Sequence, residues 1–152
     1  MMLSPLSPYL HEISGALDSA GIGVTGWHAV RHRATHVGLL EWGPRNPACA
    51  GRWPDGISAA RFPDGWTVTT TEYIGVPHDL HPLPLHPWAQ PGDVAAALAA
   101  LLAAGPDALP PTEPGRGSRG AAAPAGERWS GAAAAQAALD RLDPHGTDTF
   151  AG

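Results

Sequence analysis

Lysine is absent from this chain of 152 residues, and its nine basic residues are all arginine. Aspartate and glutamate together number 14, so the formal net charge is −5. Non-specific affinity for nucleic acid comes from neutralising phosphates with lysine and arginine. The charge balance therefore disfavours a protein that coats DNA, and nucleic acid is not the partner that we expect.

Cysteine is nearly absent as well, because Cys49 is the single one in the chain. An intrachain disulfide cannot form, and a cysteine-rich zinc site is excluded. Such cysteine usage fits a reducing, cytoplasmic location. Activation of a thiol needs a base or a cation within hydrogen-bond reach. No family signature of a reactive cysteine surrounds Cys49, so we expect its thiol to be unreactive.

Two kinds of motif are also missing. The sequence has neither an apolar run of 18 or more residues nor the charged and apolar regions of a signal peptide, which argues against a membrane span and against ordinary secretion. It has no G-x-S-x-G elbow, phosphate-binding glycine loop or H-E-x-x-H helix. We therefore expect a protein that is not an enzyme and that needs no cofactor.

Large apolar residues are scarce only in the last third of the chain. Residues 1–105 hold 23 of the 27 Leu, Ile, Val and Phe residues and five of the six Trp. Residues 106–128 are rich in Pro, Gly and Ala and have too little apolar surface to offset the entropy of ordering. We predict a folded domain over 1–105, a disordered linker over 106–128, and a conditional helix with a tail over 129–152.

Periodicity within the first 105 residues predicts an α+β fold. Leu6, Leu10, Ile13 and Leu17 recur at helical spacing, and alternating or β-rich segments bounded by turn residues follow. Five prolines in 76–91 indicate an extended path over the surface. We expect an antiparallel sheet of about four strands packed by two helices, with the strands at 22–31, 35–42, 57–62 and 66–74 and the helices at 8–20 and 91–104.

A further helix is predicted over 129–142. Trp129, Leu139 and Leu142 share one face with two alanines. That face buries little, and an isolated helix of this length is marginal in water. We expect the helix to become ordered only against a partner or against the core, and we assign these three residues to partner binding.

Two groups of histidines are candidate metal ligands. His28, His32 and His36 follow an H-x3-H-x3-H spacing that would align three imidazoles on a helix, although the residues around them favour strands and a turn. The Pro-rich segment contributes a second group, His78, His81 and His86. The alternative for both groups is a set of solvated strand and loop histidines.

Arginine and tryptophan alternate through residues 27–88, as in proteins that stack bases of single-stranded nucleic acid on aromatic rings. The same window carries five acidic residues, so only 28–52 is locally basic. In a small domain most tryptophans belong to the core, which is the competing interpretation. The candidate contacts are Arg31, Arg33, Arg45 and Arg52.

The order of helix, paired strands, Asp-Gly-Trp turn and closing helix resembles small actinobacterial domains of unknown function. The matching residues are Tyr9-Leu10, Glu41-Trp42, Asp64-Gly65-Trp66 and the run 91–102. In size and Ala/Pro-rich composition the chain is also similar to the spread proteins that accompany transfer genes on actinomycete conjugative plasmids. The resemblance implies a non-enzymatic accessory protein with a role in plasmid transfer or spread.

These observations together favour an adaptor that acts through protein–protein contacts. A metal-binding protein and a single-strand binder are the alternatives. The identity of the protein partner and the oligomeric state are left open by the sequence.

Overall fold

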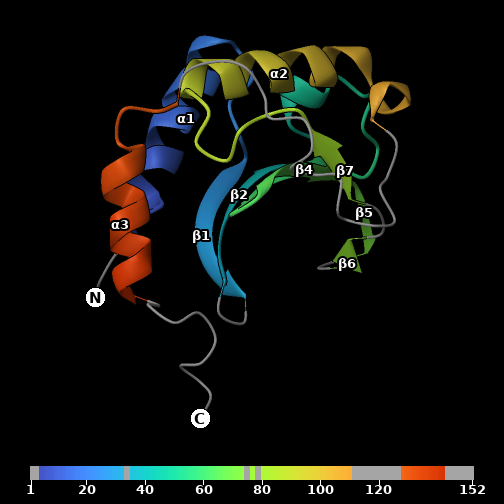
Figure 1. Cartoon of the computed structure of the whole chain (residues 1–152). Helices are drawn as coiled ribbons and strands as arrows, with labels where there is room; N and C mark the ends of the chain where they lie inside the picture. The colour runs from blue at the N-terminus through green and yellow to red at the C-terminus, as the bar shows by residue number, and fades with distance from the viewer. Residues whose placement is uncertain (1–3, 33–34, 74–75, 78–79, 111–127, 143–152) are drawn as a thin grey trace.

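The computed structural model describes residues 4–32, 35–73, 76–77, 80–110 and 128–142 (Figure 1). It confirms the α+β class, with three α-helices and a five-stranded antiparallel sheet. The elements in chain order are α1 (Ser7–Ser19), β1 (Gly26–His32), β2 (Thr35–Trp42), η1 (Pro47–Cys49), β3 (Ile57–Phe62), β4 (Gly65–Thr69), β5 (Thr71–Tyr73), β6 (Val76–Pro77), β7 (His81–Leu83), α2 (Pro91–Ala104), η2 (Pro106–Ala108) and α3 (Ala132–Leu142).

The sheet has one strand more than predicted. Its order is β1-β2-β3-β4-β7, so β7 comes from the Pro-rich segment and pairs with β4. Proline has no backbone N–H to donate, but an edge strand tolerates it because only one side is paired. The strand predicted over 66–74 is divided, since β5 leaves this sheet and pairs with β6.

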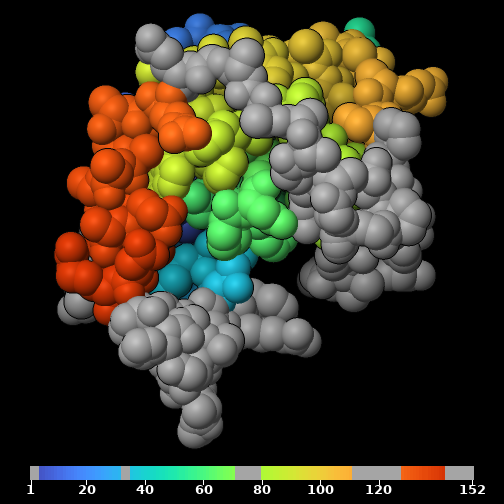
Figure 2. All heavy atoms as spheres, in the orientation of Figure 1, coloured from blue at the N-terminus to red at the C-terminus, as the bar shows by residue number. Residues whose placement is uncertain are grey.

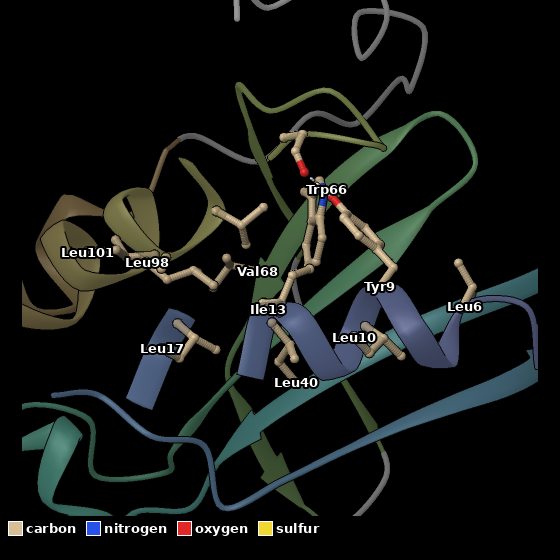
Figure 3. Packing of buried hydrophobic residues seen from close by; sticks show 14 of the residues in the cluster. Leu6, Tyr9, Leu10, Ile13, Leu17, Leu40, Trp66, Val68, Leu98 and Leu101 are labelled. Carbon is tan, nitrogen blue, oxygen red and sulfur yellow. Dashed lines mark hydrogen bonds between the residues drawn. The ribbon is translucent and has the colours of Figure 1, made fainter. Parts of the chain in front are cut away.

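α1 and α2 lie together on one face of the sheet (Figure 1). The apolar side chains of α1 that recur at helical spacing are fully buried between α2 and the strands (Figure 3). Gly38 in β2 allows this close approach, because a Cβ there would lie 2.8 Å from the Cδ2 atom of Leu10. The absence of a side chain at residue 38 therefore seats α1 directly on the sheet.

α2 closes the other side of this core. It begins at Pro91, as proline at a first helical position favours, and buries Val94, Leu98 and Leu102. The indole N–H of Trp53 donates to the carbonyl of Leu102 at 3.2 Å, which fixes the end of the helix. α2 has 14 residues and is the longest of the helices that the structure describes. No helix in the described ranges is long and apolar enough to cross a bilayer.

α3 joins the same hydrophobic core as the first 105 residues. Trp129, Ala132, Ala135 and Leu139 are buried in the cluster that α1 and α2 form with the sheet. The sequence predicted that this helix becomes ordered either against a partner or against the core. In the structure it packs against the core. Most of the predicted linker, residues 111–127, lies outside the described part of the chain.

Candidate functional site

A groove of about 710 Å³ opens between the start of α1, strand β1 and the end of α3. Ligand sites commonly occupy hollows of about 300–1,000 Å³, so its size suits a small molecule or a few residues of a peptide. Its walls come from residues more than a hundred positions apart in sequence, which explains why no local pattern reveals it.

The floor and sides of the groove are mostly apolar. Pro5 contributes from the segment before α1, Pro8 from the first turn of α1, and Leu142, which is 43% exposed, from the end of α3. The half-buried ring of Trp27 projects from β1 toward the same space. An aromatic ring beside aliphatic carbons favours an apolar side chain as occupant.

Arg141 is the charged side chain on the rim of the groove. Arg141 from α3 and His11 from α1 line it, and the described lining residues include no carboxylate. The His11 imidazole is held beside Trp27, with ring centroids 6.4 Å apart. Asp140, the acidic residue nearest to Arg141 in sequence, accepts a hydrogen bond from the side chain of Gln136.

The α3 wall is anchored by a cluster of aromatic rings. Trp129 packs on Tyr9 of α1 with a centroid distance of 4.8 Å and stacks on Trp88 at 5.8 Å. The backbone N–H of Trp129 donates to the carbonyl of Trp88 at 2.7 Å. The Trp88 indole in turn donates to Gln136 of α3 at 3.0 Å. Figure 2 shows the segment before α2, in yellow-green, lying against α3.

A buried cation supports this aromatic cluster from the sheet. Arg61 of β3 is 1% exposed, its guanidinium lies 4.0 Å from the centre of the Trp88 ring, and its Nε donates to the carbonyl of Pro87. Burial lowers the pKa of Arg61 to about 10, against the opposing effects of Tyr9 and Asp64. Burial also raises the pKa of the Tyr9 hydroxyl, which donates to the carbonyl of Ala89. At neutral pH the cluster therefore holds a charged arginine and a neutral tyrosine.

β1 forms an open edge of the sheet beside the groove. In the sheet of described strands it has a neighbour on one side only, β2, with which all seven of its residues pair. Ala29 is half-buried, and Val30 is 38% exposed. Trp27 belongs to this edge strand, so the strand contributes a side chain to the groove.

The three histidines of the first predicted metal group do not share a face. In the β1–β2 register His28 is opposite Leu39, whereas His36 is opposite Arg31, which places His28 and His36 on different faces of the hairpin. The His28 ring lies 3.1 Å from a Glu41 carboxylate oxygen. His32 ends β1 opposite Thr35.

The second predicted metal group has separate partners as well. His81 Nδ1 lies 2.6 Å from the carbonyl oxygen of Pro110, and His86 Nδ1 accepts from the backbone N–H of Trp88. His78 is outside the described residues. Within the described part of the chain, no three His, Cys, Asp or Glu side chains gather as metal ligands would.

The predicted nucleic-acid residues lie at two ends of the sheet. Arg31 lies next to the last residue of β1, whereas the exposed Arg45 and Arg52 follow the far end of β2. An eight-residue strand spans roughly 26 Å at 3.3 Å per residue. Arg33 is outside the described residues. Four of the five tryptophans in this window, at positions 42, 53, 66 and 88, are buried and present no ring for base stacking.

The Cys49 thiol is buried in the core, and its Sγ contacts the carbonyl oxygen of Gly43 at 3.4 Å. Burial raises its pKa. A nucleophilic cysteine needs the thiolate form and access to a substrate, and this environment favours neither.

The residues assigned to partner binding divide into two kinds. Trp129 and Leu139 are covered by the chain's own core, whereas Leu142 faces the groove. The sequence did not single out the groove residues Trp27, His11 and Arg141 as a set, because only the docking of α3 brings them together.

Comparison with known protein families, with curated proteins and with solved structures finds no match for this chain, so its function is inferred from its own geometry.

Proposed function

We propose that the protein is a non-enzymatic adaptor that binds an extended segment of a partner protein along the edge of β1 with which no described strand pairs. The observation that carries the proposal is the contrast between the two edges of the sheet. An unpaired edge strand presents a row of backbone N–H and C=O groups, and an added strand satisfies them.

The β7 edge is blocked. β7 has three residues and Pro82 at its centre, so its middle residue has no N–H to offer. The segment that follows α2 also contacts this strand, since His81 Nδ1 lies 2.6 Å from the carbonyl oxygen of Pro110. Short strands and prolines are the usual protection of an edge against further pairing.

The β1 edge lacks both protections. It has seven residues and no proline, and the groove beside it would receive side chains of an added strand. Because side chains of a strand alternate between faces, every second residue of the added segment would point toward the helices and into the groove.

Adjacent proline substitutions in β1 test this proposal. Backbone groups of neighbouring strand residues point to opposite sides, so one of Ala29→Pro and Val30→Pro removes an N–H that faces β2, and the other removes one that faces outward. We expect one variant to be destabilised and the other to keep its melting temperature within about 5 °C.

The binding partners for this test are peptides selected on the wild-type chain from a random peptide library and measured by titration. The stable proline variant should bind them at least about tenfold more weakly than the wild type, because a blocked edge residue prevents continuous pairing. Unchanged affinity in that variant, or a library that yields no binding peptide, contradicts the proposal.

A further inference from the structure

The groove beside β1 favours particular side chains in a segment that binds there. Its apolar surface is supplied by Trp27, Pro8 and Leu142, and its rim by Arg141 and His11. The two surfaces lie within one hollow of about 710 Å³. An occupant that satisfied both would carry an apolar side chain and a negative charge close together.

Arg141 is the main source of the positive charge. It is exposed, and it forms no ion pair with any described residue. It lies in the last turn of α3, where a cation offsets the partial negative charge of the helix end. The start of α1 presents the positive end of its helix dipole, and its first turn contains no acidic side chain that would offset that partial charge.

The spacing of the two preferred groups follows from strand geometry. If the segment pairs with β1, residues i and i+2 point to the same face, about 6.5–7 Å apart. An apolar residue over Trp27 and an acidic residue toward Arg141 would then be separated by one residue that faces the other side of the sheet.

We propose that the groove selects a partner segment with an apolar residue and an aspartate or glutamate two positions apart, the carboxylate pairing with Arg141. This inference rests on the proposed function, since the β1 edge sets the spacing. It names the partner as an acidic, extended peptide segment.

Three short peptides of about seven residues, the length of β1, provide the test. All have a Thr-rich host sequence. The first has Leu and Asp two apart, the second has Asn in place of Asp, and the third has Leu and Asp adjacent, so that they point to opposite faces. We expect the first to bind the wild type about fivefold more tightly than either other peptide, the effect of one ion pair near the surface.

Chain variants assign that difference to one residue. Arg141→Gln should remove the preference for Asp over Asn. The control is Arg45→Gln, which makes the same charge change at an exposed residue in the loop after β2. It should leave the preference intact. About 1 M salt should also reduce the preference, because the Debye length falls to about 3 Å.

The outcomes separate this inference from the proposed function. Equal affinity of all three peptides, or a preference that survives Arg141→Gln, overturns the acidic motif while edge pairing stands. The acidic motif is also overturned if none of these peptides binds at about 1 mM while library-selected peptides that lack the motif do bind. A dimer that Arg141→Gln dissociates would make a second copy the occupant and overturn the peptide inference. If neither designed nor selected peptides bind, the proposed function fails with it.

Discussion

The two helices that wall the groove are attached by different kinds of contact. α1 places Leu10, Ile13 and Leu17, all fully buried, between the sheet and α2. α3 buries two alanines and Leu139, and its largest anchor, Trp129, precedes the helix. Because apolar burial stabilises roughly in proportion to area, about 25 cal/mol per Å², the α1 wall is held more strongly than the α3 wall.

This difference bears on binding. Arg141 and Leu142, which we assign to recognition, belong to the weakly held wall, while Pro8 and His11 belong to the strongly held one. Elements that adjust to ligands tend to come from the less stable part of a fold. A groove with one fixed wall and one adjustable wall can fit different apolar side chains while it keeps the strand edge in place.

The largest effect is expected from truncating the α1 wall. Leu10→Ala removes a fully buried side chain that packs on Gly38, and we expect it to lower the free energy of unfolding by about 2–5 kcal/mol in urea titrations. The matched variant in α3, Leu139→Ala, should cost less than about 2 kcal/mol, because the helix can separate from the core without global unfolding. Equal losses would contradict the contrast between the walls.

A smaller and local effect is expected from Trp129→Ala. Without the ring that packs on Tyr9 and Trp88, α3 should open on its own, and its amides should exchange with deuterium at least about tenfold faster. Amides of β2 and β3 should keep their protection. Leu142→Ala, which truncates an exposed side chain of the same helix, is the control and should change stability by less than about 0.5 kcal/mol. Faster exchange throughout the sheet would show that α3 is integral to the fold.

Gln136→Met tests the polar part of the same anchor. It removes the acceptor of the Trp88 indole N–H at similar side-chain size, and we expect a loss of about 1 kcal/mol in α3 protection. Asp140→Ala removes the other hydrogen bond of Gln136, which is exposed, and should change little. If both variants behave alike, the hydrogen bond to Trp88 does not hold α3.

The sequence predicted the fold better than the site because the two depend on different distances along the chain. The period of Leu10, Ile13 and Leu17 is a local signal, and so is the Pro-Asp-Gly turn at 63–65, which joins β3 and β4 as expected. β7 was missed because five prolines obscure a three-residue edge strand.

The site depends on contacts that local patterns cannot show. Trp129 has the spacing of a partner-binding face, and only the structure shows that the chain's own Tyr9 and Trp88 cover it. Arg141 looks like an ordinary exposed helix residue until α3 is docked beside Trp27. Likewise, the hairpin register, rather than the H-x3-H spacing, decides that His28 and His36 lie on different faces.

The smallest effect at neutral pH, and one that grows on acidification, is expected at His86. Burial, followed by the charges of Arg128 and Arg61, lowers the pKa of His86. At pH values between the ordinary pKa of about 6.5 and the lower native pKa, the imidazole is protonated in the unfolded chain but not in the folded one. The stability that His86 contributes is therefore retained above about pH 6.5 and is lost as the pH falls through the native pKa. Protonation also removes the Nδ1 lone pair that accepts from Trp88, so the loss should appear first in α3.

His86→Asn keeps a hydrogen-bond acceptor but cannot titrate in this range. At about pH 7 it should match the wild type in α3 amide protection, and below about pH 6 it should lose less protection than the wild type does. The charges of Arg128 and Arg61 both act on His86. High salt screens the exposed Arg128 more than the buried Arg61, so the acid-induced loss of α3 protection in the wild type should shrink in high salt. If wild type and variant lose α3 protection in parallel on acidification, another group causes the pH response of α3. The difference in attachment between α1 and α3 would then stand, but it would not depend on His86.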